Sequence, residues 1–309
     1  MSRYDLCLAW NWEYDGDFVH LIEVACVARG VSLLEATPES LEQVLAGLGN
    51  KDISFRMLFD RASESDPRFQ PLVDWATQNS AYCMNQQERT LWSGDKATMH
   101  LEFISRGLYT PYTIILSPYS SQPFIAPSDL WPLGGSFAIK PACEGGGDGV
   151  ILEATSWQQV LQARQQYPHE KYLLQAHVTT RCLDGRPAWF RVLYCHGAIY
   201  PCWWDQHTHV YARVTAEEKA RFGLRNLREL SIRIAQICDL QLFSTEIALT
   251  EEGKFLVVDY VNDPVDLRLQ SKAIDGVPDG YVESIAARLV RLVENHCTGV
   301  SSTNRTERL

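Results

Sequence analysis

Hydrophobic positions in the first ninety residues alternate between strand-like and helix-like spacing. Short apolar runs, typical of buried strands, cover residues 4–10, 31–36 and 53–61. Apolar positions at helical spacing cover residues 18–30, 40–50 and 68–79. Strands that alternate with helices predict right-handed crossovers and a small parallel sheet. This segment has no G-x-G-x-x-G turn, so we do not expect it to bind a dinucleotide.

The pattern changes at Asp95. From there to residue 116 it predicts a helix that Gly107 ends, a Thr-Pro turn and a strand. A loop rich in proline and serine follows, with one short helix, and leads into a glycine-rich stretch. Beyond it, helices are predicted over residues 156–167, about 224–238 and 281–296. Strands are predicted over residues 171–178, in a run that ends at about 214, and in a hairpin over 241–261.

Composition and charge exclude several classes of protein. With 46% hydrophobic and 21% charged residues, the chain resembles globular proteins rather than disordered or fibrous ones. Its net charge of -10, without a long basic run, gives no electrostatic drive toward nucleic acid or an anionic membrane. The 9 cysteines are scattered without zinc spacing, and we find no signal-peptide core or long apolar run. We therefore expect a cytoplasmic protein with free thiols.

The glycine-rich stretch "FAIKPACEGGGDGVI", residues 137–151, joins two apolar strands. It is not a Walker A loop, because Lys140 precedes the glycines and a strand rather than a helix follows them. A glycine-rich turn can form a nest of backbone N–H groups that holds an anion, and a lysine at the strand end adds a full charge. The alternative is a flexible hairpin tip with a solvated lysine.

A second candidate site lies in "LFSTEIALTEEGKFLVVDYVND", residues 242–263. A two-residue turn at Glu252 and Gly253 would place Glu246 directly opposite Asp259. Carboxylates with Cβ atoms about 5 Å apart repel each other unless a cation such as Mg²⁺ lies between them. The alternatives are a bulged turn that offsets the two acids, or one acid on an exposed face.

Together these features resemble the ATP-grasp family over the segment from Asp95 to about Asn262. The resemblance implies an α/β and α+β protein with a small N-terminal βαβ domain ahead of a two-subdomain ATP-grasp fold. We assign residues 1–94 to a Rossmann-like pre-ATP-grasp domain and 95–178 to the subdomain with the glycine-rich loop. Residues 179–297 form the C-terminal subdomain with the metal site, and the polar tail 298–309 is expected to be disordered.

The resemblance also implies which residues bind the phosphates. The entry segment "DKATMHLEFISRGLYTP" and the motif "IKP" are similar to those that supply phosphate-binding lysines in the family. These lysines map to Lys96 and Lys140, and Lys140 is also assigned a catalytic role. "EGGGDGV" resembles the family's flexible loop, whose glycines map to Gly145, Gly146 and Gly147.

Other motifs resemble the parts that bind the nucleoside and the reacting phosphate. "YLLQAHV" is similar to the hinge strand, which puts Gln175 and Val178 at the positions that read the adenine edge. "WFRVLY" resembles the "D-x-R-V" strand, whose catalytic arginine near the γ-phosphate or acyl phosphate maps to Arg191. Asp184 is the candidate for the ribose-binding acid, although it lies further along the chain than the pattern implies.

The metal-binding residues implied by the resemblance are Glu246, Asp259 and Asn262. The usual pattern has one residue between the second acid and the asparagine, whereas two residues intervene here. Strict alternation along a strand would therefore turn Asn262 away from Asp259. A bulge would restore it, and Asp263 is the alternative ligand.

The resemblance implies ATP with Mg²⁺, or Mn²⁺ in its place, as cofactors. It implies a ligase that activates a small carboxylate as an acyl phosphate and joins it to an amine. The candidate substrate-binding cations are Arg213, Arg268 and Lys272, each of which could instead form a surface ion pair with Asp266, Asp275 or Glu217. Alternatives with the same architecture are a kinase for a sugar or polyol hydroxyl and a non-catalytic ATP-binding regulator. Members of the family are often homodimers.

Overall fold

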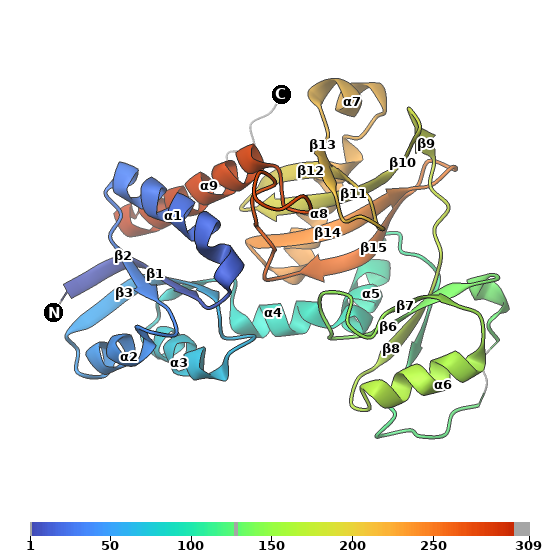
Figure 1. Cartoon of the computed structure of the whole chain (residues 1–309), viewed down its shortest axis with the longest axis horizontal. Helices are drawn as coiled ribbons and strands as arrows, with labels where there is room; N and C mark the ends of the chain where they lie inside the picture. Colours follow the sequence, from blue (N-terminus) through green and yellow to red (C-terminus); the bar gives the residue numbers. More distant parts are fainter. Residues whose placement is uncertain (1, 127–128, 300–309) are drawn as a thin grey trace.

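The computed structural model describes residues 2–126 and 129–299. These residues form two sheets of four strands, one sheet of five strands and a two-stranded ribbon. Figure 1 shows the N-terminal sheet at one end of the molecule, the five-stranded sheet above α4 (Gln87–Gly94) and α5 (Lys96–Ser105), and the other four-stranded sheet beyond α5. Within the described ranges, no helix combines the length and the apolar character that crossing a bilayer requires.

The N-terminal sheet has the strand order β2-β1-β3-β4, and all its pairings are parallel. Its strands are β1 (Ser2–Trp10), β2 (Leu33–Ala36), β3 (Ile53–Arg61) and β4 (Tyr82–Met84). The connecting helices are α1 (Gly16–Arg29), α2 (Leu41–Gly49) and α3 (Gln70–Gln78). The predicted parallel sheet is therefore confirmed. The sequence did not indicate β4, because three residues are too few to show a period.

Alternating side chains of β1 pack on the two faces of this sheet. Leu6 and Leu8 pack in a hydrophobic cluster with α1 and α9 (Asp279–Thr298). Cys7 and Ala9 point the other way, into a cluster with α2 and α3. The sheet is thus covered on both faces, as its apolar strands require. The C-terminal helix completes the N-terminal layer.

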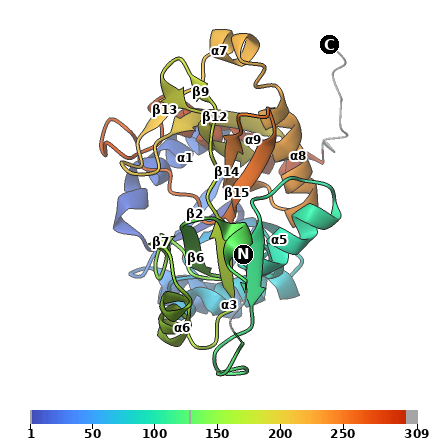
Figure 2. The same ribbon diagram turned by 90° about the vertical axis from the view of Figure 1, so that its right-hand side faces the viewer.

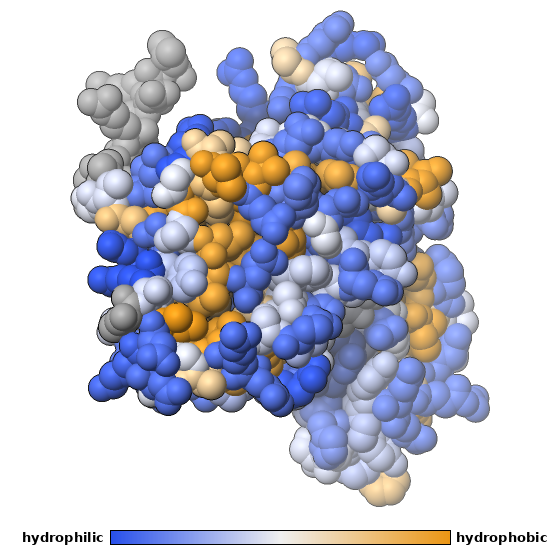
Figure 3. Space-filling view, turned by 60° about the vertical axis from the view of Figure 1, so that its left-hand side comes forward, coloured by the Kyte–Doolittle hydropathy of each residue, from blue (hydrophilic) through white to orange (hydrophobic). Residues whose placement is uncertain are grey.

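Helix α1 is apolar on its outer face as well. It leaves Val24 and Val27 exposed, at 53% and 84% of their surface. Hydrophobic side chains gather on the side of the molecule that Figure 3 brings forward. The helix ends at Gly30, whose φ of 66° is the left-handed conformation that glycine adopts without strain.

The second sheet has the order β5-β8-β6-β7 and is antiparallel. It contains β5 (Thr113–Leu116), β6 (Phe137–Pro141), β7 (Ile151–Ala154) and β8 (Tyr172–Ala176). Helix α6 (Trp157–Gln166) packs on it through a cluster that includes Val160 and Ala163. The helix begins at Ser156, which forms a reciprocal capping box with Gln159.

The third sheet has the order β13-β12-β11-β14-β15 and is also antiparallel. Its strands are β11 (Trp189–Cys195), β12 (Ala198–Trp204), β13 (Tyr211–Arg213), β14 (Leu242–Leu249) and β15 (Phe255–Asn262). Helix α8 (Asn226–Cys238) lies against one face, where Leu227 packs with Phe190. The opposite face packs on α9 through Leu193 and Leu242. The ribbon of β9 (Cys182–Leu183) and β10 (Arg186–Pro187) lies beside α7 (Ala216–Arg221) in Figure 2.

The end of the chain departs from one expectation. Thr298 is the last residue of α9, and Gly299 caps the helix in the left-handed conformation. The rest of the predicted disordered tail, residues 300–309, lies outside the described residues. Helix α9 therefore extends to the start of the segment that we expected to be disordered.

We predict that replacing Ile285 by alanine lowers the free energy of unfolding by about 2–5 kcal/mol. Ile285 is fully buried in the cluster that joins α9 to α1 and to the N-terminal sheet. Glu283→Ala, on the exposed side of the same helix, should change this free energy by less than about 0.5 kcal/mol. Urea unfolding followed by circular dichroism measures both. Equal losses from the two variants would contradict the packing of α9.

Candidate functional site

The hairpin of β14 and β15 places Glu246 and Asp259 directly opposite each other, as predicted. The turn that we expected at Glu252 and Gly253 is wrong, because Leu249 pairs with Phe255 at the end of the hairpin. The register shifts by one residue between Glu246 and Ile247. This irregularity offsets the longer turn, so the two acids still face each other.

A second irregularity turns Asn262 toward Asp259. Ser244 pairs with Asn262 while Glu246 pairs with Asp259, so three steps along β15 match two steps along β14. The Asn262 Nδ2 atom donates a hydrogen bond of 2.8 Å to Oδ2 of Asp259. Asp263 instead accepts a hydrogen bond of 2.9 Å from the Thr90 hydroxyl on α4. The bulge, rather than Asp263, therefore brings the third polar side chain to the acid pair.

Glu246 is held by donors on both of its carboxylate oxygens. Nη1 of Arg191 lies 3.4 Å from Oε1, and Nε1 of Trp189 donates to Oε2 at 3.0 Å. Arg191 pairs with Glu246 across the adjacent strands β11 and β14 and also donates to the Ser244 hydroxyl at 3.3 Å. Its guanidinium lies over the Trp204 ring, 4.9 Å from the centroid. These contacts fix both the acid and the arginine.

Lys140 approaches the acid pair from β6 of the second sheet. Its Nζ donates to Oε1 of Gln175 on β8 at 2.9 Å, and Nε2 of Gln175 donates to the Tyr260 hydroxyl at 3.1 Å. Nδ1 of His100 lies 2.7 Å from the same hydroxyl. This polar chain connects α5, the second sheet and β15. It uses the side chain of Gln175, so the predicted contact of this residue with adenine remains a prediction.

The charges of this cluster shift one another's pKa values. Burial raises the pKa of Glu246, and repulsion by Asp259 adds to this, against the opposing effect of Arg191. Burial also acts to raise the pKa of Asp259, but the positive charges of Lys140 and Lys96 outweigh it and lower that pKa. Burial and the charge of Lys96 lower the pKa of Lys140, while the two acids oppose this. The five side chains therefore form one electrostatic unit.

Lys96, the first residue of α5, is bound to the chain on either side of Cys143. Its backbone N donates to Ala142 O at 2.9 Å, and its Nζ donates to Glu144 O at 2.6 Å. Asp95 caps the helix by accepting from two backbone N–H groups of its first turn. The base of the glycine-rich loop is thus attached to the start of α5.

The glycine-rich loop is open to solvent. A Cβ atom added at Gly145, Gly146 or Gly147 would meet no heavy atom within 4 Å. Gly146 and Gly147 have φ angles of 62° and 87°, which explains why the chain uses glycine there. Their binding of phosphate stays a prediction, as do the roles of Lys96, Lys140 and Arg191.

One predicted nucleotide contact, Asp184, lies apart from this cluster. Asp184, in the turn between β9 and β10, accepts hydrogen bonds of 2.7 and 3.0 Å from Arg221 of α7. The ribbon and α7 lie at the end of the molecule opposite α6 in Figure 2. Val178 follows β8 and packs against the hydrophobic cluster that also contains Trp189, and its predicted contact with adenine stays a prediction. Asp184 thus forms an ion pair with an exposed arginine, and its predicted contact with ribose stays a prediction.

The predicted substrate-binding cations have different surroundings. Nη2 of Arg268 lies 2.7 Å from Asp266 and 2.9 Å from Asp275, the ion pairs that we gave as the alternative. Arg213 is exposed and lies over the Tyr281 ring, 4.5 Å from its centroid. Lys272 is exposed in the segment between β15 and α9. Nothing in these contacts selects a substrate.

Sequence analysis missed Trp189 and Tyr260, although both side chains contact the cluster. Trp189 occupies the acidic position of the "D-x-R-V" pattern and donates to Glu246 instead of adding a third acid. Tyr260 lies between two predicted metal ligands in the sequence and points to the other side of β15. Among residues 2–126 and 129–299, no group of three or more His, Cys, Asp or Glu side chains is placed to hold a metal. The candidate metal site therefore consists of two carboxylates and one amide.

Comparisons with known proteins identify the fold of this chain. No family model and no curated protein matches the sequence. Solved structures match nearly the whole chain, among them a RimK domain ATP-grasp protein from Sphaerobacter thermophilus, with 17% identity and a TM-score of 0.62 over 94% of this chain and 100% of that one. D-alanine–D-alanine ligase from Bacillus anthracis, complexed with ATP, has 12% identity and a TM-score of 0.63 over 97% and 98% of the two chains. The chain has the ATP-grasp fold.

A third ATP-grasp structure, the ligase PsnB complexed with its precursor peptide PsnA2 and AMPPNP, has 11% identity and a TM-score of 0.62 over 95% of this chain and 98% of that one. The predicted fold is therefore confirmed, including the parallel sheet that precedes the two ATP-grasp subdomains. At these identities the likeness extends to the fold and not to a particular substrate.

We predict that Tyr260→Phe lowers the free energy of unfolding by about 1–3 kcal/mol. The change removes the hydroxyl that Gln175 and His100 both contact and leaves their buried polar atoms without a partner. Tyr109→Phe is the matched control, because the Tyr109 side chain is 60% exposed. Urea unfolding of the two variants should separate them. A neutral Tyr260→Phe change would show that the polar chain contributes no net stability.

A second prediction concerns pH. Because burial raises the pKa of Glu246 above its ordinary value of 4.5, this group stabilises the fold fully below 4.5 and loses that contribution as the pH rises through the raised value. We expect wild type to lose stability relative to Glu246→Gln over this range, by about 1.4 kcal/mol for each tenfold gain in proton affinity. Urea unfolding in EDTA between pH 4 and 8 measures the difference. A difference that does not vary with pH, or that changes with the opposite sign, would contradict the assignment.

Proposed function

We propose that this protein is an ATP- and Mg²⁺-dependent ligase that activates a carboxylate as an acyl phosphate and joins it to an amine. ADP and phosphate would be the other products. The observation that carries the proposal is the pair of facing carboxylates, Glu246 and Asp259, surrounded by Arg191, Lys140 and Lys96. All five side chains are partly buried, and removing charges from water costs free energy unless they bind a ligand or compensate one another fully. Phosphates would pair with the positive side chains, and a divalent cation would pair with the two carboxylates.

The residues present fit a divalent cation. The negative charge of Asp259 contributes to the raised pKa of Glu246, and a metal ion between the two acids would reverse this effect. Asn262 donates its Nδ2 to Asp259, which leaves its amide oxygen available as a ligand. Carboxylate and amide oxygens are hard donors of the kind that Mg²⁺ and Mn²⁺ accept. When bound, such an ion polarises phosphate oxygens and neutralises their charge.

The positive side chains would stabilise charge on the transferring phosphoryl group. Arg191 and Lys140 flank the acid pair from two different sheets, so they can contact a phosphate from opposite sides. Burial acts against the charge on Arg191, but Tyr211 and the two acids outweigh it and raise its pKa, so the arginine stays charged. Preorganised charges of this kind lower the barrier to phosphoryl transfer without a protein nucleophile. The open glycine-rich loop offers backbone N–H groups to the same phosphates.

The comparisons support this function at the level of the fold. The matching structures include ATP-grasp ligase PsnB complexed with a minimal precursor, Mg and ADP, at 14% identity. They also include the D-cycloserine synthetase DcsG, at 15% identity. ATP and Mg²⁺ are therefore the cofactors that we infer for this chain. Its carboxylate and its amine are not identified by this likeness.

The test is ATP-dependent ADP release with a panel of small carboxylic acids, with and without hydroxylamine. Hydroxylamine traps an acyl phosphate as a hydroxamate, so it reports carboxylate activation directly. We expect Lys140→Ala and Glu246→Gln each to lower kcat/KM by about 100-fold or more while circular dichroism shows an intact fold. Lys254→Ala removes an exposed lysine in the hairpin turn and should leave activity unchanged.

Two outcomes would contradict the proposal. ADP release without any hydroxamate, stimulated by sugars or polyols, would indicate a kinase. A protein that gains thermal stability with ATP but never releases ADP would be a non-catalytic binder. Full turnover by either charge variant would also overturn the role given to its residue.

A further inference from the structure

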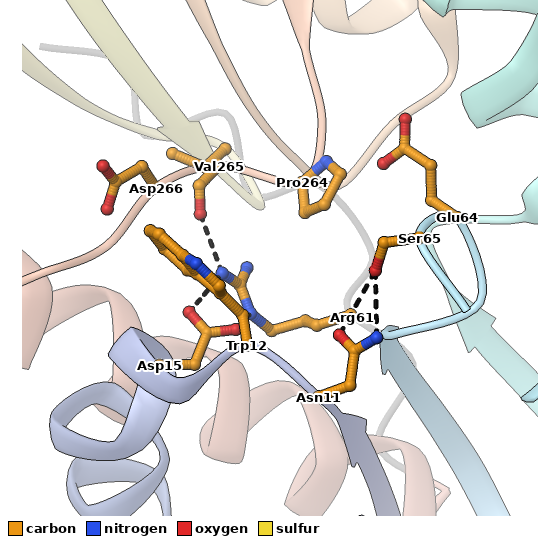
Figure 4. A pocket seen from close by; sticks show the side chains of 9 residues that line it. All are labelled: Asn11, Trp12, Asp15, Arg61, Glu64, Ser65, Pro264, Val265 and Asp266. Atoms are coloured by element: carbon orange, nitrogen blue, oxygen red, sulfur yellow. Dashed lines mark hydrogen bonds and ion pairs between the residues drawn. The ribbon is translucent and has the colours of Figure 1, made fainter. Parts of the chain in front are cut away.

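A cavity of about 350 Å³ lies between the N-terminal sheet and the segment that follows β15. Figure 4 shows its walls: residues that follow β1, residues that end and follow β3, and residues 264–266 above them. None of the residues that we assigned to ATP or to the metal lines this cavity. A volume of this size suits a small ligand.

The topology of the sheet favours a ligand at this place. In the strand order of this sheet, β2 lies next to β1 on one edge, whereas β3 and then β4 lie on the opposite side of β1. The direction of winding therefore changes between β1 and β3. In open α/β sheets, ligands bind in the crevice at the carboxyl ends of the strands where this change occurs. Trp12 follows β1, and Arg61 ends β3, so the cavity occupies this crevice.

Arg61 supplies a buried donor that the fold leaves unused. Its side chain is only 3% exposed, and its Nε and Nη2 donate to the two oxygens of Asp15 at 2.8 and 2.7 Å. Nη2 also donates to Val265 O at 2.9 Å. Nη1 has no hydrogen-bond partner among the described residues, and Figure 4 shows the guanidinium inside the ring of cavity residues. A buried N–H group without an acceptor is costly, so the position calls for an acceptor on a ligand.

The rim of the cavity carries the opposite charge. Glu64 and Asp266 project from opposite sides in Figure 4. Asp266 is already paired with Arg268, whereas Glu64 has no ion-pair partner in the described ranges. The Glu64 side chain is exposed, yet its partial burial, together with the negative charges of Asp263 and Asp60, raises its pKa. A cation beside Glu64 would relieve this repulsion.

The cavity is connected to the acid pair through the chain itself. Pro264, which forms part of its upper wall, lies two residues after Asn262. A ligand in the cavity therefore lies next to the segment that carries the candidate metal ligands. Arg61, with its unpaired N–H group, and Glu64 both line this cavity.

We propose that this cavity binds an α-amino acid zwitterion that serves as the attacking amine. Its carboxylate accepts from Nη1 of Arg61, and its ammonium group lies beside Glu64. This inference rests on the proposed ligase function. The ammonium loses one proton to Glu64 or to solvent, and the amine nitrogen forms a C–N bond to the acyl carbon. The C–O bond to phosphate breaks, and the second proton leaves with the phosphate.

The binding test uses saturation-transfer NMR on the full chain, with a mixture of L- and D-α-amino acids and with the corresponding α-carboxamides. The carboxamides keep the ammonium group but lack the carboxylate. We expect amino acids to bind about 10-fold more tightly than their amides, because only they can pair with Arg61. Glu64→Gln should weaken amino-acid binding by about 3- to 10-fold. Glu13→Gln, an exposed acid outside the cavity lining, is the matched control and should leave binding unchanged.

Arg61→Lys tests the floor of the cavity, and it should remove the preference for acids over amides. Arg61 also pairs with Asp15, so circular dichroism is needed to show whether the Arg61→Lys variant folds. If it does not fold, the Glu64→Gln variant and the comparison of amino acids with their amides test the inference instead. Absence of amino-acid binding, equal binding of acids and amides, or unchanged binding by Glu64→Gln would each overturn the inference.

Hydroxamate formation separates this inference from the proposed function. Hydroxylamine replaces the amine, so Glu64→Gln should form hydroxamate at the wild-type rate while its yield of the amide product falls about 10-fold at subsaturating amino acid. If wild type forms no hydroxamate with any acid, the ligase function itself fails. If hydroxamate forms only from the amino acid that occupies this cavity, the occupant is the carboxylate substrate and the inference is wrong.

Discussion

The structure of the site depends on the repulsion between two carboxylates that one hairpin holds face to face. Glu246 and Asp259 would destabilise β14 and β15 if they stood alone. Arg191 compensates Glu246 from the neighbouring strand, and Lys140 compensates Asp259 from a different sheet. The second and third sheets are thereby attracted to each other at this cluster. In the function that we propose, the charges that stabilise the folded protein are also the ones that a triphosphate and a divalent cation would contact.

Much of the fold could be predicted because it depends on local period. The strands and helices of the N-terminal layer follow apolar spacing closely, and Gly30 ends α1 where the sequence indicates. The short strand β4 and the separate helix α4 were not predicted, because neither has enough apolar positions to show a period. The packing of α9 on the N-terminal sheet could not be predicted either, since it joins residues more than 200 positions apart.

The site was predictable where it follows strand pairing and unpredictable where it depends on side-chain partners. The facing of Glu246 and Asp259 follows from counting along a hairpin, although the count succeeded only because a bulge offset an error in the turn. The orientation of Asn262 depends on the second bulge, which the extra residue before Asn262 indicated as one of two alternatives. The contact of Trp189 with Glu246 and the pairing of Asp184 with Arg221 depend on tertiary packing, so no motif could indicate them.

Lys96 has a consequence for the movement of the glycine-rich loop. Its ammonium group is bonded to the carbonyl oxygen of Glu144, just before the three glycines. An incoming phosphate oxygen would have to take this ammonium group away from that carbonyl or share it. In the function that we propose, binding of the nucleotide at Lys96 would release the base of the loop from this bond, so that the loop could close over the phosphates only once they are present.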